Sequence, residues 1–121
     1  MNPVVWFEIP VENLERAKSF YESVFNFEMP ISEMGPAKMA WFPGGPGEGV
    51  SGALVKTEGY TPSHHGSIVY FHAPDIESSL KAVEENGGKT LAPKMSIGEH
   101  GWFAQFEDSE GNRVSLHTPA E

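Results

Sequence analysis

The sequence has 121 residues, of which 39% are hydrophobic and 21% charged, and this composition is typical of one globular domain spanning residues 1–121. Asp and Glu number 17 against 8 Lys and Arg, so the net charge of −9 disfavours nucleic acids and anionic membranes as partners. The sequence has no cysteine, no visible signal peptide and no apolar run long enough for a bilayer, which excludes disulfides and predicts a cytoplasmic protein.

The first half of the chain, at about 1–58, has the pattern of a strand, a helix and three further strands. The first strand is expected at Val4–Ile9, and Asn13 is a suitable N-cap for the helix that follows. Apolar residues then recur at helical spacing, at Leu14, Ala17, Tyr21 and Val24. The three short strands are expected near 27–33, 37–43 and 50–56, with the glycine-rich run 44–49 as a hairpin turn.

The second half, at about 67–119, repeats this order after a linker at about 59–66. A strand is expected at Ser67–His72, Asp75 is the expected N-cap of a helix, and Asn86-Gly87-Gly88 is expected to end that helix. The inward positions of this helix are Ile76, Leu80 and Val83. The remaining strands are expected near 89–95, 101–107 and 113–118. The linker is interpreted as flexible, and its adjacent His64 and His65 as ordinary polar residues.

The two halves are related by a single shift along the sequence. Residues 11–15 resemble residues 73–77, a shift of 62 (73 − 11), and the same shift places Leu54 on Leu116. Because one shift serves the start and the end of each half, the repeat is expected to need no gap. The pattern predicts an α+β fold made of two tandem βαβββ modules.

Three stretches resemble the vicinal oxygen chelate superfamily, which contains glyoxalase I, extradiol dioxygenases and bleomycin-resistance proteins. They are the strand and helix start at 7–21, the helix end Val-Glu-Glu-Asn-Gly-Gly at 83–88, and the turn Asp-Ser-Glu-Gly-Asn at 108–112. The resemblance covers nearly the whole chain and implies a curved mixed sheet around a small-molecule cup. It also implies a homodimer, which in some members forms by exchange of halves through the linker.

The resemblance further implies where a metal would be bound in the metal-dependent members of the superfamily. The corresponding positions are Trp6, Ala53 (or Gly52 with a slipped register), Ile68 and Ser115. Such a site needs three or four nitrogen or oxygen donors around one divalent ion. Trp, Ala and Ile supply none and Ser is a poor ligand, so no metal cofactor is expected at this place.

Strand alternation predicts which side chains line the cup. If Phe7 and Ile9 pack under the helices, Trp6 and Glu8 face the cup. The predicted ligand-binding residues are Trp6, Glu8, Trp41, Tyr70, His72, Trp102, Ser115 and His117, with the facing of Trp41 and Trp102 left open. A mostly aromatic lining with a few polar groups is typical of small-molecule pockets.

Two main functions follow from this lining. The first is metal-independent binding of a small apolar or aromatic molecule in the cup. The alternative is an enzyme, a glyoxalase-like lyase, an isomerase or a dioxygenase, that uses a divalent metal displaced onto Glu8, His72 and His117, or Glu8 as a general base beside a histidine. A third hypothesis is a partner-binding module whose cup is closed by side chains such as Trp6 and Trp41. For the enzyme alternative, Glu8 is the candidate catalytic residue.

Overall fold

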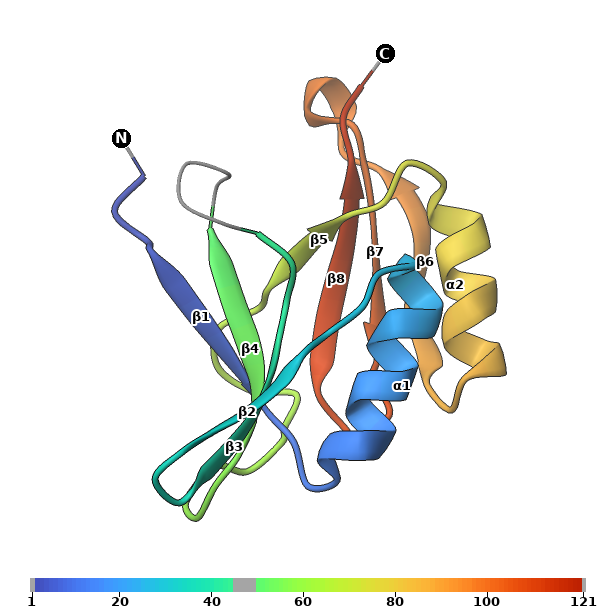
Figure 1. The fold of residues 1–121 in the computed structure, drawn as a ribbon. Helices are drawn as coiled ribbons and strands as arrows, with labels where there is room; N and C mark the ends of the chain where they lie inside the picture. Colours follow the sequence, from blue (N-terminus) through green and yellow to red (C-terminus); the bar gives the residue numbers. More distant parts are fainter. Residues whose placement is uncertain (1, 45–49, 121) are drawn as a thin grey trace.

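The computed structural model describes residues 2–44 and 50–120, which form two four-stranded mixed sheets with one helix packed on each (Figure 1). The first module contains β1 (Trp6–Pro10), α1 (Leu14–Phe25), β2 (Ile31–Met34), β3 (Ala37–Trp41) and β4 (Ser51–Lys56). The second contains β5 (Tyr70–His72), α2 (Ile76–Glu85), β6 (Lys89–Ser96), a 3-10 turn at Gly98–His100, β7 (Trp102–Glu107) and β8 (Arg113–Thr118). This confirms the predicted α+β fold of two βαβββ modules.

The two sheets have the same strand order, β1-β4-β3-β2 and β5-β8-β7-β6. In each sheet the first strand is parallel to the last, and the other neighbours are antiparallel. Glu8 lies opposite Ala53, and Tyr70 lies opposite Ser115. Tyr70 follows Glu8 by 62 residues (70 − 8), and Ser115 follows Ala53 by the same number (115 − 53). The pairing of these residues therefore confirms the repeat at the first and last strands of each module.

The prediction that the repeat needs no gap is wrong at the third strand. Trp41 of β3 lies opposite Ala53, whereas Gln105 of β7 lies opposite Ser115. The shift between these equivalent residues is 64 (105 − 41), so the connection from the third to the fourth strand is two residues longer in the first module. A change of two residues keeps every side chain on its own face. Most of the predicted glycine-rich turn, residues 45–49, lies outside the described residues.

The helix boundaries follow the polar residues that the sequence offers for capping. Asn13 Oδ1 accepts a hydrogen bond from the backbone N–H of Arg16 at 3.0 Å, and Asp75 Oδ1 accepts one from Ser78 at 3.1 Å. Gly87 follows α2 with φ 97°, a left-handed conformation that glycine adopts without a side-chain clash. These caps confirm the predicted start of both helices and the end of the second.

Two strands are shorter than predicted. β2 begins at Ile31, because the preceding segment leaves α1 through Asn26 at φ 57° and its Met29 N–H donates to the Glu22 carboxylate at 2.8 Å. β5 is limited to Tyr70–His72, since it is an edge strand that pairs only with β8. β5 keeps the predicted side-chain alternation, because Phe71 packs against the core while Tyr70 and His72 are exposed.

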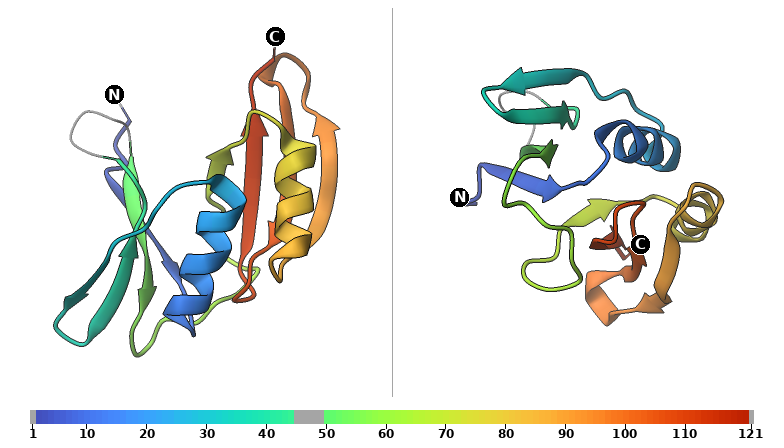
Figure 2. Two further views of the ribbon diagram at one scale, coloured as in Figure 1. Left: turned by 45° about the vertical axis from the view of Figure 1, so that its right-hand side comes forward. Right: turned by 90° about the horizontal axis from the view of Figure 1, so that it is seen from below.

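The core lies between the two helices and the faces of the sheets that they cover, and it is shared by both modules. α1 and α2 lie side by side on the same side of the two sheets (Figure 2). Phe71 of β5 contacts Phe7 and Phe42 of the first sheet, with ring centroids 6.1 and 5.2 Å apart. Aromatic packing across the module boundary therefore fixes how the two sheets are placed.

The turn at 108–112 fastens the second module to the first. Asp108 is buried and accepts hydrogen bonds from Tyr21 Oη at 2.7 Å and from two backbone N–H groups of its own turn. Glu110 accepts from Arg16 Nε at 2.7 Å and from the backbone N–H of Glu12 and Asn13. The motif shared with the superfamily is thus a structural connection between modules, and its acidic groups do not line the predicted cup.

These contacts shift the pKa values of the connected groups. Burial raises the pKa of Asp108, and burial together with the neighbouring Asp108 raises the pKa of Tyr21 well above its usual value. Burial alone would also raise the pKa of Glu110, but the hydrogen bonds from Arg16 and from two backbone N–H groups outweigh it and lower that pKa. The two carboxylates of one turn therefore shift in opposite directions.

Candidate functional site

The candidate site is the face of each sheet that the helices do not cover, called here the helix-free face. On β1, Phe7 and Ile9 pack into the core, which leaves Trp6 and Glu8 on the helix-free face as predicted. On β8, Val114 and Leu116 are core residues. The helix-free face of the second sheet consequently carries Tyr70, His72, Phe103, Gln105, Glu107, Arg113, Ser115 and His117.

An apolar surface covers the helix-free face of the first sheet. Trp6 and Trp41 pack edge to face with ring centroids 5.0 Å apart, over Met39, Ala53 and Val55. We call these five residues the indole wall. The two indoles are partly exposed while the three smaller residues are buried, so part of the aromatic surface remains exposed to solvent. The structure therefore places both tryptophans of the first module on one wall, including Trp41, whose facing was open.

Glu8 lies beside the indole wall and is held by two donors. Its Oε1 accepts a hydrogen bond from Tyr60 Oη at 2.8 Å, and its Oε2 accepts one from Trp6 Nε1 at 3.3 Å. The side chain is exposed, and neither hydrogen bond comes from a histidine. The arrangement expected for the enzyme alternative, with Glu8 as a general base beside a histidine, is thus not the one in the structure.

The second sheet carries a chain of polar side chains on its helix-free face. Arg113 Nη1 donates to Gln105 Oε1 at 3.0 Å, and Gln105 Nε2 donates to Ser115 Oγ at 3.1 Å. Ser115 is fully buried, at 0% exposure, so its hydroxyl is a positioned partner of Gln105 and not a free nucleophile. These hydrogen bonds fix the orientation of the polar side chains on this face, and fixed polar groups are what orients a ligand in a binding site.

The histidines of the second sheet lie next to each other but do not form a metal centre with Glu8. His72 and His117 face each other in the register of β5 and β8. His117 Nε2 donates to the backbone oxygen of His100 at 2.7 Å, and since that oxygen only accepts, Nε2 carries a proton and is not free to bind a metal. Across residues 2–44 and 50–120, no three His, Asp or Glu side chains are grouped to hold an ion.

The positions that hold metal in the metal-dependent members do not fit a divalent cation here. Ala53 is fully buried, at 0% exposure, beneath the indole wall, and Trp6 covers the same region from β1. Ser115 is engaged with Gln105, and Ile68 has a hydrocarbon side chain. None of the four supplies the charged or imidazole donors that such an ion requires. The displaced-metal alternative of Glu8, His72 and His117 also lacks the grouping it needs.

Trp102 is placed differently from the other predicted ligand-binding residues. It alternates with Ala104 and Phe106, which are core residues, and therefore lies on the helix-covered side of β7. The Lys94 ammonium group lies 4.9 Å from the centre of its ring, and Lys94 also approaches Glu77 of α2. The prediction of Trp102 as a ligand-binding residue, with its facing left open, is therefore corrected: strand alternation places it on the face of Ala104 and Phe106, while the register equivalent of Trp41 is Gln105 on the opposite face.

The linker between the modules is tied to both sheets, which corrects its interpretation as a flexible segment. Tyr60 contacts Glu8 of the first module. Ser63 exchanges backbone-mediated hydrogen bonds with Asn112 and Arg113, and His64 Nε2 lies 2.8 Å from Glu107 Oε1. The linker therefore forms part of the helix-free surface, and Tyr60 is a site residue that the sequence patterns did not identify.

The structure brings some predicted site residues into common cavities. Tyr70 and His72 border a cavity of about 200 Å³ whose other lining includes Phe7, Phe42 and Phe71. Glu8 lines a separate cavity of about 90 Å³ between β1 and β8, together with Arg113. The indole wall and the polar residues of the second sheet are therefore adjacent surfaces, with Glu8 and Arg113 at their boundary.

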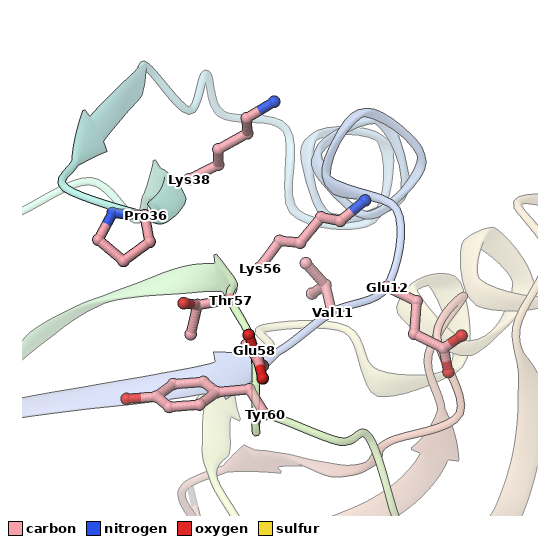
Figure 3. Close-up of a pocket in the computed structure, with 8 residues that line it drawn as sticks. All are labelled: Val11, Glu12, Pro36, Lys38, Lys56, Thr57, Glu58 and Tyr60. Carbon is pink, nitrogen blue, oxygen red and sulfur yellow. The ribbon is translucent and has the colours of Figure 1, made fainter.

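A further cavity, of about 400 Å³, opens between the β2–β3 hairpin, the end of β4 and the turn before α1 (Figure 3). Its lining includes Lys38 and Lys56, which lie directly opposite each other in the register of β3 and β4. In Figure 3 both lysine side chains extend toward the same side of the cavity, and Val11 lies next to Lys56. No residue predicted for the site lines this cavity, although Tyr60, the partner of Glu8, does.

Two further polar residues, Gln105 and Arg113, were also missed from the sequence. Gln105 was detectable as a single uncharged polar residue between Ala104 and Phe106, in the middle of an otherwise apolar strand. Arg113 follows the motif at 108–112 directly, but its role depends on contacts with Gln105 that no sequence spacing indicates.

Comparison with known proteins identifies the class to which this fold and site belong. The model of the Glyoxalase/Bleomycin resistance protein/Dioxygenase superfamily matches residues 4–116, so the chain belongs to this superfamily. A glyoxylase-like domain-containing protein from Didymella fabae is 38% identical over 119 residues, which cover 92% of this chain and 89% of that protein.

Solved structures support the same fold. A glyoxalase I mutant from Zea mays superposes with a TM-score of 0.73 at 22% identity, over 95% of this chain, which spans only 46% of the maize chain. TnmS3, an antibiotic binding protein from Streptomyces sp. CB03234, superposes with a TM-score of 0.69 at 20% identity, over 99% of this chain and 98% of that one. Within the described ranges, neither helix is long and apolar enough to cross a bilayer.

Proposed function

We propose that the protein binds a small aromatic or apolar molecule on its helix-free face without a metal ion. The observation that carries this proposal is the indole wall, in which Trp6 and Trp41 cover Ala53 at a position where metal-dependent relatives hold their ion. The exposed aromatic surface offers affinity, and Glu8, Tyr60 and the Arg113–Gln105–Ser115 chain offer directional polar groups. TnmS3, an antibiotic binding protein, has the same fold, so the proposed binding role is one that this fold can serve.

The three tryptophans of the chain provide the test. Two-dimensional NMR of a ¹⁵N-labelled sample, with EDTA present, follows the three indole N–H signals while the neutral probe 2-naphthamide is added. Trp6 and Trp41 are expected to shift in a saturable way, while Trp102, on the other side of the second sheet, serves as the internal control. Trp6→Ala and Trp41→Ala are each expected to weaken binding by about three- to tenfold, and Trp102→Ala to leave it unchanged.

Other outcomes argue against the proposal. Shifts that affect only Trp102, or that do not saturate, would mean that the indole wall is not a ligand site. Shifts confined to the backbone of Tyr70 and Phe71 would move the site to the cavity of about 200 Å³ that these residues border.

We also propose that the chain forms a homodimer, as the superfamily resemblance implies. Val5, at 81% exposure, and Met34, at 61%, are large apolar side chains that a second copy would remove from water. Light scattering coupled to size-exclusion chromatography is expected to give twice the mass of one chain, and a single-chain mass over the micromolar range would contradict it. Cytoplasmic location stays a prediction from the sequence.

A further inference from the structure

Arg113 is a cation that its nearest acidic neighbour does not neutralise. It is the first residue of β8, on the helix-free face, and its cross-strand partner in β7 is Glu107. The Glu107 carboxylate is instead engaged by His64 Nε2 at 2.8 Å, and no ion pair of Arg113 is present among the described residues. In a chain with a net charge of −9, a fixed guanidinium beside a cavity is a distinctive feature.

One nitrogen of the Arg113 guanidinium has a hydrogen-bond acceptor, and another has none among the described residues. Nη1 donates to Gln105 Oε1 at 3.0 Å, and Gln105 is fixed in turn by its bond to Ser115 Oγ. Nε is buried and has no hydrogen-bond acceptor within the described part of the chain. A buried donor without an acceptor is destabilising, so such groups in native proteins usually meet a water, an ion or a ligand.

The adjoining cavity has the size of a small polar group. Arg113 lines the space of about 90 Å³ between β1, β8 and the linker, and the other polar lining comes from Ser63, Ser67, Asn112 and Glu8. A water molecule takes about 30 Å³, so the space has room for a group of the size of a carboxylate. The guanidinium fork of arginine matches the two oxygens of a carboxylate better than any other side chain.

The cavity also lies next to the indole wall. Glu8 borders the cavity, and its Oε2 accepts the hydrogen bond from Trp6 Nε1. A ligand whose ring packs on Trp6 can therefore extend a substituent past Glu8 toward Arg113.

We infer that the molecule bound by this protein is an aromatic carboxylic acid, whose carboxylate is held by Arg113 while its ring packs against the indole wall. This inference rests on the proposed function and adds the chemical class of the ligand. Glu8 is the opposing charge in the same cavity, so it disfavours the carboxylate. Substitutions of Arg113 and of Glu8 should therefore change the affinity for the carboxylate in opposite directions. Binding through apolar contacts alone would not give this pattern.

The experiment compares 2-naphthoate with its uncharged analogue 2-naphthamide, by calorimetry at pH 7 on the full chain. The wild-type protein is expected to bind the acid about tenfold more tightly than the amide, because a charge-assisted hydrogen bond replaces a neutral one. Arg113→Gln is expected to weaken binding of the acid about tenfold more than binding of the amide, which abolishes this preference, and Glu8→Gln is expected to increase the preference. Equal affinities in the wild type, or a preference that survives Arg113→Gln, would overturn the inference while leaving the proposed function intact.

A second measurement does not depend on the indole wall or on a folded Arg113→Gln variant. The N–H signal of Arg113 Nε is identified in wild-type NMR spectra by its loss in Arg113→Lys, and sodium acetate is added against sodium chloride of equal ionic strength. A saturable shift with acetate alone supports a carboxylate site at Arg113, even if neither naphthalene probe binds and the proposed function fails. An identical response to both salts contradicts the site.

Discussion

The hydroxyl of Tyr21 donates a hydrogen bond of 2.7 Å to Oδ2 of Asp108, and these residues lie 87 positions apart in the chain. Tyr21 belongs to α1 of the first module, and Asp108 follows β7 of the second. The bond is buried, and burial raises the pKa of both groups. One contact therefore couples the packing of the two modules to the ionisation of a carboxyl group.

Removing this donor is expected to destabilise the fold. Tyr21→Phe leaves Asp108 with fewer donors at a buried site, so the free energy of unfolding should fall by about 1–3 kcal/mol. Urea denaturation at pH 7 measures the change. Tyr70→Phe, at a tyrosine with 54% exposure, is the matched control and should change stability by less than about 0.5 kcal/mol. Equal effects of the two substitutions would show that the buried bond contributes nothing.

Glu110 is expected to make stability depend on pH. Its pKa is lower in the folded state than the usual 4.5, so its contribution is complete above that value and is lost as pH falls through the folded pKa. Glu110→Gln should therefore lower the free energy of unfolding by about 1–3 kcal/mol at pH 7 and by progressively less below pH 4.5. Urea titrations from pH 7 down to about pH 3 follow this difference.

The control for this series is Glu33→Gln, at an exposed position of β2, which should show no such trend. Asp108 opposes Glu110, because its raised pKa makes the folded state less favourable as pH rises above the usual 3.8. A penalty in Glu110→Gln that is constant from pH 3 to 7 would contradict the assignment.

Reversing the charge of one lysine in the first sheet is expected to stabilise the fold. Lys38 and Lys56 lie directly opposite each other, and like charges in this arrangement are destabilising. Lys38→Glu should raise the free energy of unfolding by about 0.2–1 kcal/mol, and Lys38→Gln by less. Thermal unfolding in low salt should show the gain, which should shrink in 1 M NaCl because salt screens exposed charges. A gain that does not change with salt would indicate a cause other than charge.

Treatment with a metal chelator is expected to leave the stability of the protein unchanged. The four positions equivalent to metal ligands in the superfamily are occupied by poor or non-ligating residues, Trp6, Ala53, Ile68 and Ser115. A resident ion at 100 times its dissociation constant would contribute about 2.7 kcal/mol, or several degrees in the unfolding midpoint. Calorimetry before and after EDTA treatment, with elemental analysis of protein purified without metal affinity, checks this. A lower midpoint after EDTA together with stoichiometric metal would contradict the expectation.

The sequence by itself determined the order of elements, the helix caps and the face of most strand residues. These are local properties: Asn13 and Asp75 cap helices through bonds to residues three positions away, and strand alternation places Trp6 and Glu8 opposite Phe7. The assignment of Trp6, Ala53, Ile68 and Ser115 to the metal positions of the superfamily follows from the resemblance, and the absence of a metal cofactor stays a prediction.

Only the tertiary structure decided which side chains meet. The two extra residues between β3 and β4 made Gln105, and not Phe103, the equivalent of Trp41, and no single shift along the chain could reveal this. The contacts of Glu8 with Tyr60 and of Arg113 with Gln105 join residues on different elements. The first depends on where the linker places Tyr60 relative to β1, and the second on the pairing of β7 with β8. Both arise only when separate elements lie side by side in the folded chain, so no local segment contains them.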